Sequence, residues 1–265
     1  MGVSSATHQA WLKEVTEPVR HSVLQALPDD PLVVGLGEQR INPFLADFLG
    51  DHTYRYQAYD YFPTAPEVIK ADVNDLRPLI GVVQADILAV FRTTMFIEDK
   101  DKFFADISSI VKPGGFLFID LHIGSAYLPV LGYQYADQRV SAAFLGGPRV
   151  YYYTTFYDER LVNEYPEDVN KFCAHARFWP LATHWSELRK SRGTYLRSVT
   201  QQRGLMLNNF EERIRAITQP QHLITLQDFD DHHFDIHCFA ARYFYPVTNK
   251  FKLVGLVVAQ RRVIA

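Results

Sequence analysis

The stretch Lys112-Pro113-Gly114-Gly115-Phe116-Leu117-Phe118-Ile119-Asp120 joins a helical pattern to an apolar run. The helical pattern covers 99–111, and its apolar residues recur on one face. Proline prevents a helix from continuing, and a glycine pair supplies left-handed backbone geometry. We therefore predict an amphipathic helix over 99–111 and a buried strand over 116–121.

Strand and helix patterns alternate upstream of this junction. The apolar run Leu32-Val33-Val34-Gly35-Leu36-Gly37 predicts a buried strand that ends in glycines, and the segments 54–59, 68–73 and 85–91 also resemble strands. Helices are predicted over 43–49 and over 6–27, where Pro18 predicts either a kink or two shorter helices. Alternating elements with strands that are apolar on both faces predict an α/β fold with a mainly parallel sheet.

Composition excludes several classes of function. The 265 residues carry a net charge of −3, with 27 basic and 30 acidic side chains, so we expect neither nucleic acid nor a membrane as a partner. Two cysteines form no disulfide framework, and no apolar run reaches the roughly 20 residues that span a bilayer. With no signal sequence evident, we expect a cytoplasmic protein.

The second half of the chain is rich in aromatic residues and loses the regular alternation. Helices are plausible over 183–203 and 208–217, and strands over 223–226, 237–244 and 251–260. We interpret residues 1–265 as one domain. It would comprise an N-terminal helical segment (1–28), a core (30–122), an insertion (125–220) and closing strands (221–265).

The succession of strand 85–91, helix 99–111, Lys-Pro-Gly-Gly turn and strand 116–121 resembles the Rossmann-like class I S-adenosylmethionine-dependent methyltransferases. The glycines after the first strand and Asp60, about twenty residues on, fall in the family's order. The resemblance covers roughly residues 30–122. It implies S-adenosylmethionine as cofactor and transfer of a methyl group to a substrate.

The resemblance also implies a set of site residues. Asp60 would accept hydrogen bonds from the ribose hydroxyls, because two hydroxyl donors suit one carboxylate. Asp72 would meet the adenine amino group, with Val73 beside the ring. Catalytic roles fall to His122, as general base, and to Asp120, which both follow the fifth strand. The full set of expected cofactor-binding residues is Gly35, Gly37, Glu38, Asp60, Tyr61, Asp72, Val73, Phe91 and Arg92.

The insertion would act as a lid over the acceptor. Tyr127, Tyr133 and Tyr135 lie nearest the expected crevice in sequence, and an aromatic-lined pocket suits a small aromatic or apolar molecule. The expected reaction is O- or N-methylation of such a molecule. The same aromatic residues could equally supply a homodimer interface.

The glycine loop departs from the family pattern and leaves two alternatives open. Gly35 stands where the family usually has an acid, and Gln39 stands in place of the second glycine, with Ile41 beyond it. One alternative is a methyltransferase-like binding or regulatory protein that has lost transfer. The other alternative is an NAD(P)-dependent oxidoreductase, in which Gly35-Leu36-Gly37 would begin the dinucleotide-binding fingerprint. Arg40 stands where the third glycine of that fingerprint is expected.

Two further chemistries have weaker support. His233, Asp235 and His237 would share one face of a strand and could bind zinc or iron, but a polar turn before a strand is the stronger interpretation, so we expect no metal. The chain has no Gly-x-Ser-x-Gly elbow, so a hydrolase triad is not expected.

Overall fold

The computed structural model describes residues 5–127, 156, 158–169, 171, 224–244 and 250–263. They divide between two compact units. The first contains Ser5–Leu121, Thr225–Ala240 and the described residues from Gly255 onward, and the second draws on 122–224 and 241–254. The predicted insertion helices over 183–203 and 208–217 lie outside the described residues.

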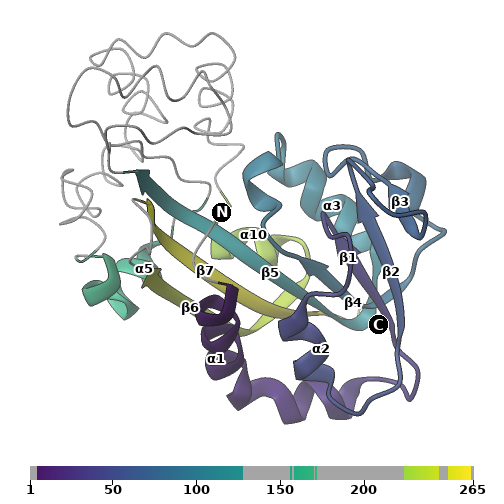
Figure 1. The fold of residues 1–265 in the computed structure, drawn as a ribbon, viewed down its shortest axis with the longest axis horizontal. Helices are drawn as coiled ribbons and strands as arrows, with labels where there is room; N and C mark the ends of the chain where they lie inside the picture. Colours follow the sequence, from purple (N-terminus) through teal and green to yellow (C-terminus); the bar gives the residue numbers. More distant parts are fainter. Residues whose placement is uncertain are drawn as a thin grey trace, which may run out of the picture. The chain divides into compact units, whose positions relative to one another are not determined.

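A seven-stranded sheet with the order β3-β2-β1-β4-β5-β7-β6 organises the chain (Figure 1). Its first strands are β1 (Leu32–Leu36), β2 (Arg55–Asp60), β3 (Val68–Lys70), β4 (Ala85–Val90) and β5 (Val111–Tyr127). These pair in parallel, β1 with β2 and β4, β2 with β3, and β4 with β5. The predicted α/β class with a mainly parallel sheet is confirmed.

The last two strands are β6 (Phe234–Phe244) and β7 (Lys250–Arg261). The end of β7 lies beside the start of β5, because Gln260 Nε2 donates to the Gly114 carbonyl oxygen at 2.9 Å. The backbone N–H of Arg262 donates to the His233 carbonyl oxygen at 2.8 Å, which places the end of β7 beside the start of β6 as well. β7 is therefore antiparallel to both neighbours.

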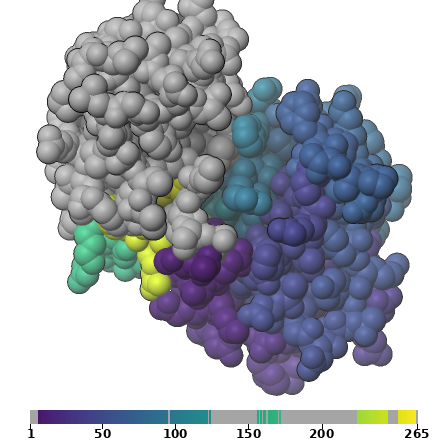
Figure 2. Space-filling model, viewed as in Figure 1, coloured from purple at the N-terminus to yellow at the C-terminus, as the bar shows by residue number. Residues whose placement is uncertain are grey.

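Helices of the first unit cover both faces of this sheet. They are α1 (Ser5–Ala26), α2 (Pro43–Leu49), α3 (Lys100–Ile110) and α10 (Leu226–Asp231). α1 packs against α2, and α10 against α3. Right-handed crossovers place α2 and α3 on opposite faces, because the chain moves in opposite directions along the sheet after β1 and after β4. In the space-filling view, α1 (purple) and the segment after it (blue) form a continuous surface (Figure 2).

Aromatic side chains fill the core on both sides of the strands. On one side, the Phe48 ring of α2 lies edge-on to Phe118 of β5, with centroids 5.1 Å apart. On the other, Phe104 of α3 lies edge-on to Phe229 of α10 at 4.9 Å. All six residues of β4 are buried, as expected for a central strand covered on both faces.

Contacts at both ends of the Lys-Pro-Gly-Gly turn explain why these residues occur there. Lys112 Nζ lies 2.8 Å from Asp86 Oδ1, and Asp86 Oδ2 accepts the Leu32 backbone N–H at 2.8 Å. Gly114 has a φ of 83°, the left-handed geometry that the sequence predicts. A Cβ at Gly115 would lie 3.0 Å from the carbonyl oxygens of Ala85, Asp86 and Lys112. The turn thus brings three strand ends together.

α1 continues as one helix through Pro18, and Figure 1 shows it bending along its length, which agrees with the predicted kink and not with two shorter helices. One boundary differs from the sequence-based expectation. The strand expected over 223–226 is wrong: of its described residues, 224–226, only Ile224 forms a bridge, with Phe156, and Leu226 begins α10. The cause is the capping box of Thr225 and Asp228, which starts a helix where the apolar pattern suggests a strand.

The described residues of the second unit include the helix α5 (Glu159–Glu164). Asp158 caps it by accepting the Arg160 backbone N–H at 2.9 Å. Asp168 Oδ1 accepts the Tyr243 backbone N–H at 2.8 Å, which ties this segment to the end of β6.

Candidate functional site

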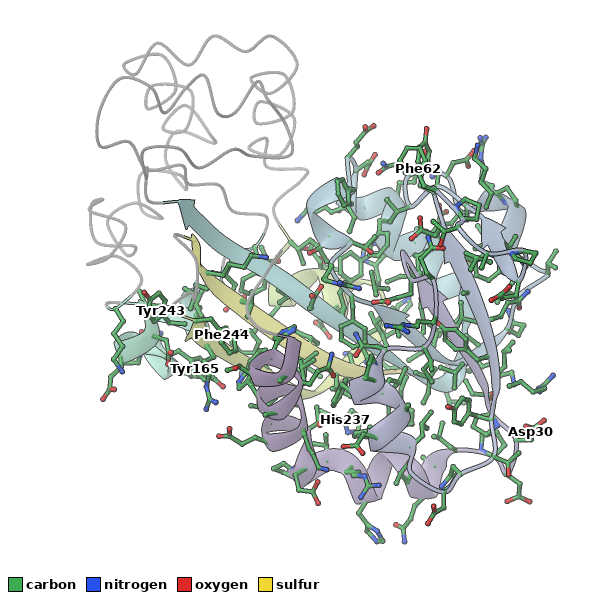
Figure 3. The ribbon with its side chains drawn as sticks, viewed as in Figure 1. Asp30, Phe62, Tyr165, His237, Tyr243 and Phe244 are labelled. Carbon is green, nitrogen blue, oxygen red and sulfur yellow. The ribbon has the colours of Figure 1, made fainter. Side chains whose placement is uncertain are left out.

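The loops after the parallel strands meet at one edge of the sheet. Glu38 follows β1, Asp60 ends β2, Arg92 follows β4, and Asp120 lies on β5. Figure 3 labels Phe62, which follows β2 at this edge, and Asp30, which precedes β1 at the opposite edge of the sheet. Ligands of open α/β sheets bind beyond the carboxyl ends of the strands, so these side chains form the candidate site.

Gly35 near the end of β1 and Gly37 just after it are both required by close packing within the protein. Gly37 has a φ of 75°, and a Cβ there would lie 2.0 Å from the Thr93 hydroxyl oxygen. A Cβ at Gly35 would lie 2.1 Å from the Tyr56 hydroxyl oxygen. The Gly37 backbone N–H donates to the Tyr59 carbonyl oxygen at 2.7 Å, which holds the loop against β2.

Glu38 is a buried carboxyl group within this loop. Its side chain is 5% exposed, and one oxygen lies 3.5 Å from an Arg92 nitrogen. The other oxygen, Oε1, is buried and has no hydrogen-bond partner among the residues that the structure describes. Burial raises the pKa of Glu38 to about 7; Asp120 and Asp60 add to the rise, while Arg92 and a hydrogen bond with Asn42 oppose it.

Asp120 holds the loop after β4 in an unusual conformation. Arg92 has a φ of 57°, which is rare for a residue other than glycine. Its backbone N–H donates to Asp120 Oδ1 at 2.7 Å, and the Asp120 side chain is buried. The Arg92 side chain itself is 71% exposed. Asp120 therefore positions Arg92 next to Glu38.

Asp60 and Tyr61 lie in a loop that is joined to the glycine loop. Asp60 Oδ1 accepts the Phe62 backbone N–H at 2.7 Å, and the Tyr61 ring packs edge-on against Phe62 at 4.6 Å. Gln39 bridges the two loops, because its amide nitrogen donates to the Phe62 carbonyl oxygen at 2.9 Å and its oxygen accepts from Thr64. Tyr61 is half exposed and offers a flat surface beside Asp60.

Asp72 and Val73 follow β3 at the same edge. Asp72 Oδ1 accepts the Asn74 backbone N–H at 2.9 Å, and Val73 is buried. Asn74 joins this loop to the one after β4, donating to the Phe96 carbonyl oxygen at 2.9 Å and accepting from the Glu98 N–H at 2.8 Å. The structure thus brings the loops after β3 and β4 together.

Five expected residues do not contribute a described side chain to this site. Phe91 is 1% exposed and packs edge-on against Phe44, so its ring is part of the hydrophobic core. His122 and Tyr127 lie on β5, but their side chains are outside the described part of the structure. Tyr133 also lies outside the described residues, as does Tyr135. Their expected roles stay predictions.

Asn42 and Tyr56 are site residues that sequence reasoning missed. Asn42 caps α2 by accepting the Phe44 N–H at 3.0 Å, and it also accepts from Gln9 of α1 at 3.0 Å. The pair Asn42-Pro43 is a typical helix start, so the cap was detectable in the sequence. No signal marked Tyr56, whose buried hydroxyl has no partner within the described ranges.

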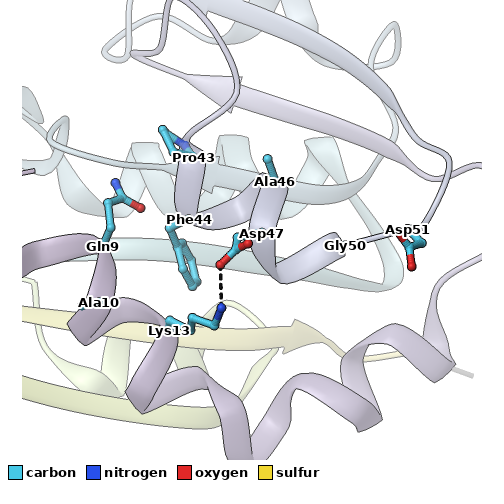
Figure 4. A pocket seen from close by; sticks show the side chains of 9 residues that line it. All are labelled: Gln9, Ala10, Lys13, Pro43, Phe44, Ala46, Asp47, Gly50 and Asp51. Carbon is cyan, nitrogen blue, oxygen red and sulfur yellow. Dashed lines mark hydrogen bonds and ion pairs between the residues drawn. The ribbon is translucent and has the colours of Figure 1, made fainter. Parts of the chain in front are cut away.

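An open groove of 710 Å³ runs between α1 and α2 on the outside of the site (Figure 4). Lys13 and Asp47 form an ion pair of 2.8 Å across it. Gln9 lines the groove and donates to Asn42, whose side chain also bonds to Glu38. Gln9 therefore connects the groove to Asn42 through one hydrogen bond.

The histidines near the start of β6 have separate surroundings. His232 Nδ1 lies 2.9 Å from the Asp228 carbonyl oxygen, and His237 packs edge-on against Phe116 at 5.9 Å. In the described part of the chain, no group of three or more His, Cys, Asp or Glu could hold a metal ion. No helix within the described residues is long and apolar enough to cross a membrane.

Comparisons with known proteins find structural likeness only. No protein-family model matches the chain, and no curated protein matches it. A SAM-dependent methyltransferase from Methanosarcina mazei is 12% identical with a TM-score of 0.42, over 93% of this chain and 98% of that chain. An O-methyltransferase family protein from Burkholderia thailandensis is 12% identical with a TM-score of 0.42, over 99% of this chain and 60% of that chain.

A third solved structure is geranyl diphosphate C-methyltransferase from Streptomyces coelicolor A3(2), in complex with Mg²⁺, geranyl diphosphate and S-adenosyl-L-homocysteine. It is 9% identical with a TM-score of 0.41, over 94% of this chain and 79% of that chain. The structures found are mostly S-adenosylmethionine-dependent methyltransferases. At these identities, the likeness concerns the fold alone.

Proposed function

We propose that this protein is an S-adenosylmethionine-dependent methyltransferase. The observation that carries the proposal is the buried carboxyl group of Glu38 within the glycine loop. A pyrophosphate-binding loop offers backbone N–H groups and a positive helix end to its ligand. Here a carboxyl group stands in the loop; burial raises its pKa, and Asp120 and Asp60 add to the rise against the opposing charge of Arg92. This acidic site favours a ligand with net positive charge.

The start of α2 also argues against a dinucleotide. Pro43 has no backbone N–H, and the Phe44 N–H is already taken by Asn42. The helix therefore has fewer donors for a pyrophosphate. The strand order differs as well, because β7 lies between β5 and β6, whereas the dinucleotide-binding order is 3-2-1-4-5-6.

The residues present fit S-adenosylmethionine. Glu38 supplies a carboxyl oxygen with no partner among the described residues, which suits a cationic group. Asp60 supplies a carboxylate beside the half-exposed Tyr61 ring for the nucleoside. Asp72 and Val73 would meet the adenine. When bound, the cofactor supplies a methyl group on a sulfonium, and the protein has to align the acceptor and exclude water.

The residues that would bind the methyl acceptor are inferred from the sequence alone. We infer that a small aromatic or apolar molecule is methylated on oxygen or nitrogen beneath the aromatic insertion, with Tyr127, Tyr133 and Tyr135 in contact. His122 would remove the acceptor proton where one must leave. Asp120 would keep Arg92 and its loop in place.

Isothermal titration of the full chain tests the proposal. We expect binding of S-adenosylmethionine and S-adenosylhomocysteine, and none of NAD(H). Asp60→Ala should weaken binding about tenfold or more through the lost charged acceptor. Asp60→Asn is the matched control for the loop, because it keeps the oxygen that accepts from Phe62. Failure of both sulfur nucleotides to bind the folded parent would disprove the proposal.

A binding or regulatory protein without transfer is the second candidate. Gln39 favours it, because its side chain ties the glycine loop to Phe62 and Thr64 where the family has a glycine. Incubation of the nucleotide-bound protein with a panel of small phenols and amines separates the two. Methylated product supports the enzyme, and binding without product from any acceptor supports the second candidate.

A further inference from the structure

We propose that Gln39 and Asn74 are positioning residues that fix the loops of the candidate site before a ligand binds. Each side-chain amide ties the loop that carries it to another loop at the same edge of the sheet. The inference rests on the proposed function, because it takes the ligand to be the sulfur nucleotide. Neither residue is among those expected to touch that ligand.

The Gln39 side chain joins the loop after β1 to the loop after β2. Its Nε2 donates to the Phe62 carbonyl oxygen at 2.9 Å, and its Oε1 accepts the Thr64 backbone N–H at 2.9 Å and the Thr64 hydroxyl at 2.8 Å. One planar amide thus holds the carbonyl of a phenylalanine and the N–H two residues later, an arrangement that we call an amide clamp. A glycine at this position, as in the family pattern, would have no side chain to form it.

Asn74 forms the same clamp between the loop after β3 and the loop after β4. Its Nδ2 donates to the Phe96 carbonyl oxygen at 2.9 Å, and its Oδ1 accepts the Glu98 backbone N–H at 2.8 Å. Asn74 is held in turn, because Lys102 Nζ donates to its carbonyl oxygen at 2.7 Å. The two amide clamps therefore tie the four loops after β1, β2, β3 and β4 into two joined pairs.

The rings of the two clamped phenylalanines are not held by burial. Phe62, labelled in Figure 3, is 75% exposed, and Phe96 is 48% exposed, although phenylalanine is usually a buried residue. Packing of these rings therefore contributes little to the conformation of the two loops. The amide clamps hold the backbone at positions where the ring does not.

Loops that are ordered in advance favour ligand binding. A ligand that meets mobile loops has to supply the free energy that orders them, whereas a preformed site avoids that cost. The Gln39 clamp acts on the expected ribose contact, because Asp60 Oδ1 accepts the Phe62 backbone N–H at 2.7 Å. Fixing the Phe62 backbone therefore also fixes the Asp60 carboxylate.

Binding of S-adenosylhomocysteine to the full chain tests the inference. Gln39→Met and Asn74→Leu keep the approximate shape of each side chain, add no charge and remove the clamp. Each should weaken binding about fivefold, mainly through slower association, because the loops must then be ordered on binding. Gln84→Met is the matched control and should bind as the parent does, because the Gln84 amide donates to the Ser109 carbonyl oxygen at 3.0 Å, before β4 and away from these loops.

A double-mutant cycle separates positioning from a general loss of stability. In the Asp60→Ala background, Gln39→Met should cause no further loss of affinity, because the carboxylate that it positions is gone. The same fivefold loss in both backgrounds would overturn the inference. Equal binding by the parent and both clamp variants, or equal weakening by Gln84→Met, would also overturn it and leave the proposed function standing.

Hydrogen exchange of the ligand-free chain provides a second measurement. The backbone N–H groups of Thr64 and Glu98 should be protected in the parent, and each clamp variant should lose the protection in its own loop alone. Exchange of both groups at the rate of an unfolded chain would overturn the inference whether or not the nucleotide binds. If the loops are protected but the parent binds no sulfur nucleotide, the proposed function fails, and the role assigned to the clamps fails with it.

Discussion

At the scale of single residues, the buried environment of Glu38 is the feature that its position in the sequence does not predict. A glutamate after two glycines reads as a solvated loop residue, yet its side chain is 5% exposed. Burial is the main cause of its raised pKa, and Arg92 and Asn42 offset only part of the effect. The folded protein thus keeps a proton on Glu38 in a range where the unfolded chain has lost it.

This residue predicts a pH dependence of stability. Between pH 4.5 and about 7, the unfolded chain releases the Glu38 proton and the folded chain retains it. The unfolded state then binds fewer protons, so the free energy of unfolding falls as pH rises through this window. The loss is on the order of 3 kcal/mol by pH 8. The Glu38→Gln variant should not show this loss of stability.

Urea unfolding of parent and Glu38→Gln at pH 4.5 and pH 8 measures this effect. We expect the variant to gain stability relative to the parent as pH rises, and Glu17→Gln to control for the substitution itself. Parallel stability profiles for parent and Glu38→Gln would show that the carboxyl group is not buried as described.

At the scale of elements, the Lys-Pro-Gly-Gly turn decides how the helix α3 passes into β5. The sequence indicates its glycines correctly, but the structure separates their roles. Gly114 needs a positive φ, while a Cβ there would touch nothing closer than 3.8 Å. Gly115 needs space, because three backbone oxygens of β4 and the turn surround it.

Alanine at each glycine should therefore cost different amounts. Gly114→Ala should destabilise by about 1 kcal/mol through backbone strain alone. Gly115→Ala should cost about 2 kcal/mol, since backbone oxygens at 3.0 Å move less easily than a flexible side chain. Chemical unfolding of the two variants compares them directly. A larger loss for Gly114→Ala would contradict this account of the turn.

At the scale of the molecule, the first unit is completed by residues that come from the far end of the chain. α10 packs on α3, and Lys100 pairs with Asp228 at 2.6 Å with both side chains largely buried. Asp228 also accepts the Thr225 backbone N–H at 2.6 Å and so caps α10. One carboxylate thus starts a helix and fastens it to an element more than 100 residues away in sequence.

Removal of this carboxylate should be costly. Asp228→Ala leaves the Lys100 ammonium group buried without its partner and should lower the free energy of unfolding by about 3 kcal/mol. Asp47→Ala, which breaks the exposed pair with Lys13, is the matched control and should change stability little. Lys100→Met tests whether the buried charge causes the loss, because it should recover stability in the Asp228→Ala background. Similar losses for Asp228→Ala and Asp47→Ala would refute the distinction.

The sequence by itself determined the α/β class, the order of elements up to β5 and the need for glycine after β1 and after α3. These depend on local periodicity and backbone geometry, which neighbouring residues set. Only the tertiary structure decided that Leu226 begins a helix, that the core takes up the Phe91 ring, and that Glu38 is buried. The physical reason is that the surroundings of Glu38 include the charges of Arg92 and Asp120 and the hydrogen bond of Asn42. These residues are separated in sequence and meet only when parallel strands end at one edge of the sheet.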